Sequence, residues 1–179
     1  MDHRDHVRLI RDGVAGVGPS WADLGAGTGA FTLALADLLG PTGTIEAIDR
    51  DAGALAQLAA SMAARFPDTD LHTTVADFTH PLELPHLDGV VMANSLHFVR
   101  DPPPVLALVL GSLRPGGHLV VVEYDSDRGN PWVPFPFSYR RWQILAADAG
   151  FVATRQLGSV PSRFLGSIYS ALSLAPDPA

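Results

Sequence analysis

The chain has 179 residues, 47% of them hydrophobic, which suits one globular domain with a sizeable core. Its formal net charge of −7 argues against binding a nucleic-acid backbone by bulk charge, and its lack of cysteine excludes disulfides and thiolate metal sites. The charged N-terminus does not resemble a signal peptide, and no apolar segment approaches the length of a membrane span. We therefore expect one cytoplasmic domain over residues 1–179, without a nucleic-acid or membrane partner.

The first predicted element is a short lead-in helix over residues 5–14. Apolar side chains such as Val7 and Val14 recur at helical spacing, and glycines then end the pattern. His3 and His6 lie three residues apart on this segment, but no further ligands follow at metal spacing. We expect both histidines to be solvated and no metal to be bound.

A glycine-dense turn lies between two apolar segments, residues 21–24 and 31–39. This pattern predicts a strand, a tight loop and a helix. Gly25, Gly27 and Gly29 can take positive φ and leave room for a ligand beside the main chain. The helix that follows directs its unpaired N–H groups at the same place. The segment is thus predicted to cradle a polar part of a ligand.

A second strand, residues 44–48, ends in the acidic residue Asp49. Asp51 is a good N-cap for a helix over residues 52–65. Asp49 lies about twenty residues past the glycine loop, where a carboxylate can accept hydrogen bonds from both hydroxyls of a ribose. The alternative is that Asp49 is another helix cap. We favour ribose binding, because a carboxylate at the end of a strand fits that mechanism.

Two further strands are predicted at residues 70–75 and 87–93. After the first, Asp77 offers a carboxylate acceptor and Phe78 an aromatic face for stacking, although a plain turn aspartate is the alternative. The second is a continuous apolar run, typical of a strand buried on both faces, and it ends at Asn94.

The rest of the chain alternates helices, strands and loops. Proline and glycine residues mark the boundaries between these elements. A proline- and aromatic-rich loop over residues 125–138 is either a packed crossover or part of a substrate wall. The predicted elements are a helix that the prolines at 102–104 open and that runs to about residue 113, a turn over 113–118, a strand over 119–124, a helix over 139–149, and strands over 151–157 and 168–174. We expect the tail, residues 175–179, to be disordered.

Several of these segments resemble motifs of the class I S-adenosylmethionine-dependent methyltransferases. Asp23-Leu24-Gly25-Ala26-Gly27-Thr28-Gly29 resembles motif I of that family, and Leu113-Arg114-Pro115-Gly116-Gly117 resembles the turn before its fifth strand. The resemblance covers nearly the whole chain, with the motifs in the family's order. It implies an α/β, Rossmann-like, doubly wound fold, with a seven-stranded, mostly parallel sheet, one antiparallel strand, and helices on both faces.

The resemblance also implies an activity and a cofactor. The chain would transfer a methyl group from S-adenosylmethionine to a nucleophilic oxygen, nitrogen or carbon atom, expected to belong to a small molecule, and release S-adenosylhomocysteine. Asp77 would meet the adenine amino group, the Phe78 N–H a ring nitrogen, and Asn94 the methionine end. The implied cofactor-binding residues are Asp23, Gly25, Ala26, Gly27, Thr28, Gly29, Asp49, Arg50, Asp77, Phe78 and Asn94.

The catalytic residues are not assigned, but His97 and Tyr124 are candidates. His97 follows the fourth strand, where the resemblance places groups near the transferred methyl, and an imidazole can accept a proton near neutral pH. The alternative is a histidine packed against Phe98. Tyr124, at the end of the fifth strand, would share the role by hydrogen bonding to the substrate.

Two other classes of function remain open. A nicotinamide-dependent oxidoreductase is disfavoured because the third glycine falls one place early and because the chain has no lysine for a Tyr-x-x-x-Lys pair. A non-catalytic partner subunit also remains, since a ligand cradle does not establish turnover. We expect a monomer or a homodimer, and the sequence does not indicate the methyl acceptor.

Overall fold

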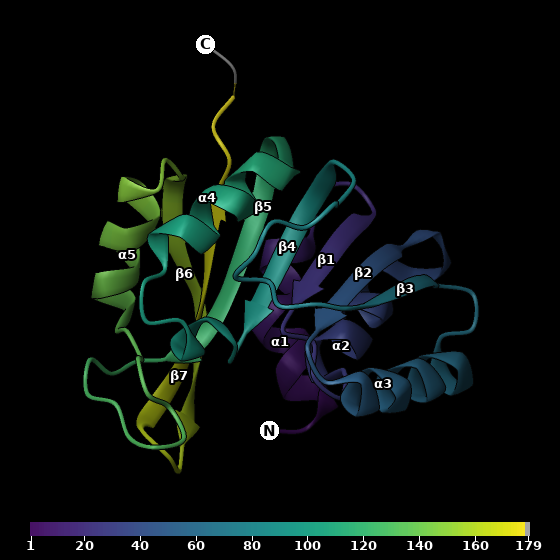
Figure 1. The fold of residues 1–179 in the computed structure, drawn as a ribbon, viewed down its shortest axis with the longest axis horizontal. Helices are drawn as coiled ribbons and strands as arrows, with labels where there is room; N and C mark the ends of the chain where they lie inside the picture. The colour runs from purple at the N-terminus through teal and green to yellow at the C-terminus, as the bar shows by residue number, and fades with distance from the viewer. Residues whose placement is uncertain (178–179) are drawn as a thin grey trace.

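The computed structural model describes residues 1–177, in which seven strands form one sheet of order β3-β2-β1-β4-β5-β7-β6 (Figure 1). Strands β1 to β5 are mutually parallel, whereas β7 is antiparallel to both of its neighbours, β5 and β6. The strands are β1 Ser20–Leu24, β2 Thr44–Asp49, β3 Asp70–Val75, β4 Leu87–Ala93, β5 Leu113–Tyr124, β6 Val152–Ser162 and β7 Gly166–Leu174. The predicted fold class is confirmed.

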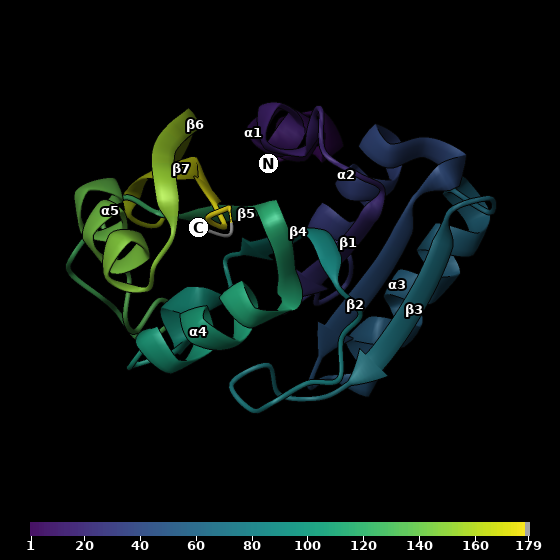
Figure 2. The same cartoon turned by 90° about the horizontal axis from the view of Figure 1, so that it is seen from above.

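Helices cover both faces of the sheet. Buried side chains of α1, α2 and α3 pack on one face, and those of α4 and α5 pack on the other. Figure 2 shows α1 and α4 on opposite sides of β5. The helices are α1 His3–Val14, α2 Ala30–Leu39, α3 Ala52–Arg65, α4 Pro103–Ser112 and α5 Tyr139–Asp148, with 3-10 turns η1 Gly40–Thr42 and η2 Leu96–Phe98.

The central strands are held by apolar residues on both faces. Every residue of β4 is buried, as predicted for a strand between two helical layers. On β5, Val120 and Val122 face the core under α1, whereas Leu119 and Val121 face the core under α4 and α5. This arrangement fixes which side chains reach the carboxyl edge of the sheet.

The start of β5 differs from the prediction. The strand begins at Leu113, six residues before Leu119, and the expected turn is an irregularity inside it, where the register with β4 shifts. Gly116 takes φ 70° there and donates its N–H to the Ala175 carbonyl at 3.1 Å. Ala175 is buried, so the expectation of a disordered tail is wrong at that residue, while residues 178–179 lie outside the described residues.

The final hairpin is longer than expected from the sequence. Strand β6 continues to Ser162 and β7 begins at Gly166, so three residues connect them instead of the predicted link over residues 158–166. Because Tyr124 of β5 pairs with Ile168 of β7, the hairpin tip stands at the carboxyl edge of the sheet.

Candidate active site

The glycine loop lies between the carboxyl ends of β1 and β2. Both Gly25 and Ala26 donate their N–H groups to the carbonyl of Ile48, at 2.8 and 3.0 Å. These two bonds fix the first half of the loop against β2, so its course is set before any ligand binds.

The three glycines of the loop have different surroundings. Gly25, Gly27 and Gly29 all have positive φ, at 83°, 53° and 93°. A Cβ added at Gly25 would collide with Ser95, and one added at Gly29 would collide with Leu58, whereas one added at Gly27 would meet no heavy atom of residues 1–177 within 4 Å. The middle glycine therefore faces open space, and the outer two are required by packing.

Asp49 at the end of β2 connects the loop to α3. Its Oδ2 accepts the N–H of Gly27 at 2.8 Å, and its Oδ1 accepts the N–H of Asp51 at 2.9 Å. The cap of α3 is Asp51, which accepts from Gly53 and Ala54, as predicted. Each Asp49 oxygen keeps a lone pair for a further donor, because a carboxylate accepts about four hydrogen bonds.

Two adjoining cavities open at this edge of the sheet, where β1 and β4 end near the middle of Figure 1. The larger has a volume of about 530 Å³ and is lined by Gly25, Gly27, Asp49, Arg50, Asp51, Ala76, Asp77, Phe78, Thr79, Asn94, Ser95, Phe98 and Val99. The smaller, of about 250 Å³, is lined by His6, Asp23, Gly25, Ala26, Gly27, Thr28, Ala30, Phe31, Ala93 and Asn94.

The cavities bring together the cofactor-binding residues predicted from the sequence, with one exception. They share Gly25, Gly27 and Asn94, so they form adjoining halves of one site. Gly29 lines neither cavity, because it is the N-cap of α2 and lies against Leu58. Its part in the site is to shape the loop.

Asp23 is a buried residue that lines the smaller cavity. It is 1% exposed, and its Oδ2 accepts the hydroxyl of Thr32 at 2.6 Å. Burial, together with the nearby carboxylate of Asp49, raises the pKa of Asp23 to about 6, and the Thr32 bond opposes this rise. The site thus contains a carboxyl group that titrates close to neutral pH.

Asn94 stands where the two cavities meet. Its main chain takes φ 52°, which is uncommon outside glycine, and its N–H donates to the Val122 carbonyl at 2.8 Å. The side-chain Oδ1 is buried and has no hydrogen-bond partner among residues 1–177. A buried, unpaired acceptor in a strained residue is typical of a group that meets a ligand donor.

Asp77 and Phe78 follow β3 and line the larger cavity. One Asp77 oxygen, Oδ1, accepts both the N–H and the hydroxyl of Thr79, at 2.9 and 2.7 Å. These bonds lower the pKa of Asp77, so the carboxylate is ionised at neutral pH. Phe78 is half-buried over the core beneath it.

His97 and Glu123 form a buried pair beside the cavities. The His97 Nδ1 lies 2.7 Å from Glu123 Oε2, and the His97 main-chain N–H donates to Oε1 at 3.2 Å. The two side chains are 3% and 0% exposed. The His97 ring lies 4.3 Å from Phe98 and 5.7 Å from Tyr124, centroid to centroid.

The linings of the two cavities do not include His97 or Tyr124, although Phe98, the next residue to His97, lines the larger one. Sequence reasoning did not single out Glu123 as the partner of His97. The available signal was a carboxylate directly after the apolar run over residues 119–122, because a buried charge needs a partner.

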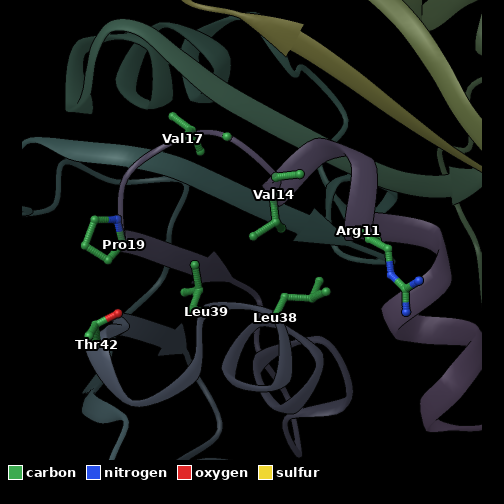
Figure 3. A pocket seen from close by; sticks show the side chains of 9 residues that line it. Arg11, Val14, Val17, Pro19, Leu38, Leu39 and Thr42 are labelled. Atoms are coloured by element: carbon green, nitrogen blue, oxygen red, sulfur yellow. The ribbon is translucent and has the colours of Figure 1, made fainter.

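A further hollow of about 370 Å³ lies at the amino edge of the sheet, away from the glycine loop (Figure 3). Val14 enters it from the end of α1, facing Leu38 and Leu39 of α2. Of the residues that line it, only Arg11 is charged. It contains none of the predicted site residues.

Within residues 1–177, no group of three or more histidine, aspartate or glutamate side chains is arranged to hold a metal ion. None of the helices in this range is long and apolar enough to cross a membrane.

The fold and the site define an α/β protein with a ligand cradle at the carboxyl ends of its parallel strands. A family model described as "Methyltransferase domain" matches residues 22–119, more than half of the chain. The chain belongs to this methyltransferase family. The comparison with curated proteins found no match.

The solved structures with a similar fold are distant in sequence. A SAM-dependent methyltransferase from Aquifex aeolicus is 18% identical with TM-score 0.71, covering 96% of this chain and 89% of that one. The YcgJ protein from Bacillus subtilis is 12% identical with TM-score 0.78, covering 98% and 100%. Human N-acetylserotonin methyltransferase, in complex with SAM, is 20% identical with TM-score 0.68, covering 97% of this chain and 51% of that one.

The class predicted from the sequence, a class I S-adenosylmethionine-dependent methyltransferase, is confirmed. The comparisons give no support to the nicotinamide-dependent oxidoreductase or to the non-catalytic subunit. The residues that line the two cavities fit the implied cofactor, because an open glycine, four carboxylates and an amide oxygen without a partner among residues 1–177 converge there.

Proposed function

We propose that the two adjoining cavities together hold S-adenosylmethionine, and that the chain methylates a nucleophilic oxygen, nitrogen or carbon atom of a small molecule. One observation carries this proposal: residues from the ends of β1, β2, β3 and β4 line two cavities that share Gly25, Gly27 and Asn94. The bound cofactor supplies a methyl group activated by its sulfonium sulfur.

Each lining residue has a defined task in this proposal. Asp49 accepts the ribose hydroxyls with the lone pairs that Gly27 and Asp51 leave unused. Arg50, Asp77 and Phe78 surround the adenine in the larger cavity. The smaller cavity takes the amino-acid end of the cofactor, whose ammonium group suits the buried acceptors of Asp23 and Asn94. Ala26 and Thr28 supply main-chain contacts.

The acceptor is proposed to lie beside the loop over residues 125–138. The Phe135 N–H donates to the His97 carbonyl at 3.0 Å, which ties this loop to the segment after β4. A hollow of about 230 Å³ between the two segments has Val99 in its lining, and Val99 also lines the larger cavity. This continuity favours the substrate-wall interpretation of the loop, although buried Val133 and Phe137 show that the loop is also packed.

His97 is proposed as the proton acceptor for substrates that arrive protonated. The short contact between Nδ1 and Glu123 favours the tautomer with its proton on Nδ1, which leaves Nε2 as the acceptor. Tyr124, an edge-on neighbour of the ring, would orient the substrate. For other acceptors, alignment of the two reactants is the main contribution of the protein.

We also infer one domain over residues 1–179, a cytoplasmic location, and a monomer or homodimer. The packing of α1 into the core under β5 supports the first of these. Size-exclusion chromatography with light scattering tests the oligomeric state.

The proposed activity is tested by thermal unfolding and by turnover. We expect S-adenosylhomocysteine to raise the unfolding midpoint and NAD to leave it unchanged, since only a ligand of the native state stabilises it. With a panel of phenols, amines and carboxylic acids, methyl-donor consumption above background identifies the acceptor class. A midpoint raised by NAD alone contradicts the proposal.

A further inference from the structure

The N-terminal helix places His6 at the edge of the ligand site. His6 lines the smaller cavity together with Asp23, Thr28 and Asn94, and its ring centroid lies 4.8 Å from that of Phe31 on α2. The side chain is half-buried. The expectation of a solvated histidine is therefore wrong for this residue, because α1 packs against α2 and does not fray into solvent.

Helix α1 is held firmly in this position. Its residues Val7 and Ile10 are buried in the core under β5, and Asp2 forms a capping box with Asp5. His3, one turn before His6, lies 3.2 Å from Asp37 of α2 through its Nε2. The two histidines thus differ: His3 contacts α2 on the outside, and His6 faces the cavity.

The charge state of His6 follows from its surroundings. Burial lowers its pKa, and the N-terminal ammonium and His3 lower it further, while Asp5 and Asp2 oppose this. Asp23 of β1 lines the same cavity. A neutral imidazole presents one N–H donor and one acceptor, so near neutral pH His6 can donate a single hydrogen bond into the cavity.

The smaller cavity has partners for both charges of an amino acid. Asp23 and the unpaired Oδ1 of Asn94 are acceptors for an ammonium group. The ten-residue helix α2 begins at Ala30, which lines the same cavity, and its N-cap Gly29 supplies no side-chain cap, so the first N–H groups of the helix are available to a carboxylate. His6 and Phe31 also line this cavity.

We propose that His6 is a positioning residue that donates a hydrogen bond to the carboxylate of the amino-acid end of the cofactor. This inference rests on the proposed function, because it assigns the smaller cavity to that end of S-adenosylmethionine. By fixing the amino-acid end, α1 fixes the direction in which the methyl group points.

The test compares two ligands that differ only in the contacted part. S-adenosylhomocysteine carries the amino-acid end, whereas 5′-methylthioadenosine lacks it. Calorimetry with His6→Ala should show affinity for S-adenosylhomocysteine weakened about 10- to 100-fold, as for the loss of a hydrogen bond to a charged group, and affinity for 5′-methylthioadenosine unchanged. His6→Gln, which keeps an N–H donor, should restore most of the affinity.

His3→Ala is the matched control, because His3 is on the same helix and outside the cavity lining. It should leave both affinities at the wild-type value. The inference is overturned if His6→Ala binds S-adenosylhomocysteine like the wild type, or if it loses affinity for both ligands equally. If the wild type itself binds neither ligand, the proposed function fails, and this inference fails with it.

Discussion

The carboxylate of Asp49 accepts the main-chain N–H of Gly27 at 2.8 Å, so a side chain from β2 holds the centre of the glycine loop that follows β1. The same residue is the proposed partner of the ribose hydroxyls. One carboxylate therefore shapes the cradle and contacts the ligand in it. This double role makes Asp49 the residue at which loop geometry and cofactor affinity are most closely connected.

Replacing Asp49 should weaken cofactor binding. Asp49→Ala removes charge-assisted bonds to two hydroxyls and releases Gly27, so we expect a loss of about 1–3 kcal/mol in the binding free energy of S-adenosylhomocysteine. Isothermal calorimetry measures it. Asp68→Ala, on the exposed turn before β3, is the control and should bind normally. If Asp49→Ala binds S-adenosylhomocysteine with unchanged affinity, the assignment of Asp49 to the ribose hydroxyls is wrong.

The three glycines should respond differently to an added side chain. Gly27→Val should abolish cofactor binding while the protein still folds, because the side chain enters open space that the ligand needs and resists positive φ. Gly29→Ala collides with Leu58, so it should lower the unfolding midpoint. Normal affinity in Gly27→Val would mean that the loop is a plain turn.

His97→Ala should reduce turnover and leave cofactor affinity unchanged. We expect a decrease of about ten- to a thousand-fold in kcat for a protonated acceptor, since its proton acceptor is lost. Single-turnover kinetics and calorimetry separate the two effects once an acceptor is found. If turnover is unchanged, His97 is not part of the mechanism and alignment alone accounts for the rate.

Glu123 should matter for stability as well as for turnover. Glu123→Ala leaves the buried His97 Nδ1 without its partner, so the free energy of unfolding should fall by about 1–3 kcal/mol. Chemical denaturation measures this change. Glu46→Ala breaks a contact to His72, whose side chain is 53% exposed, and should cost much less. Equal decreases in the free energy of unfolding in the two variants would show that the buried pair stabilises the fold no more than the exposed one.

Asp23 should make stability fall as pH rises. Its pKa in the folded state is about 6, above the ordinary 3.8, so the folded protein binds its proton more tightly than the unfolded chain does. The resulting stabilisation is complete below pH 3.8 and is lost as pH rises to 6. Relative to Asp23→Asn, the wild type should lose about 2–4 kcal/mol over this range. A constant difference between the two proteins would contradict the raised pKa.

The sequence was sufficient for the features that local patterns encode. The strand, glycine loop and helix over residues 21–39 were predicted from apolar spacing and glycine alone, and the buried strand β4 from its continuous apolar run. The features that it did not reveal depend on distant contacts. The extended start of β5 requires pairing with Ala175, and the pair of His97 and Glu123 joins residues 26 positions apart.

His6 shows the same limit within the candidate site. Its spacing from His3 suggested only a shared helix face, and nothing local indicated that α1 lies against α2 beside the glycine loop. The packing of an amphipathic helix is decided by its tertiary partners, which one sequence does not identify.

A crystal structure with bound S-adenosylhomocysteine tests the central claim most directly. We predict the ribose hydroxyls at the Asp49 carboxylate, the adenine between Arg50 and Phe78, and the amino-acid end beside Asp23 and Asn94. Electron density for the ligand outside the two adjoining cavities, for example in the hollow near Leu38 and Leu39, would contradict the account.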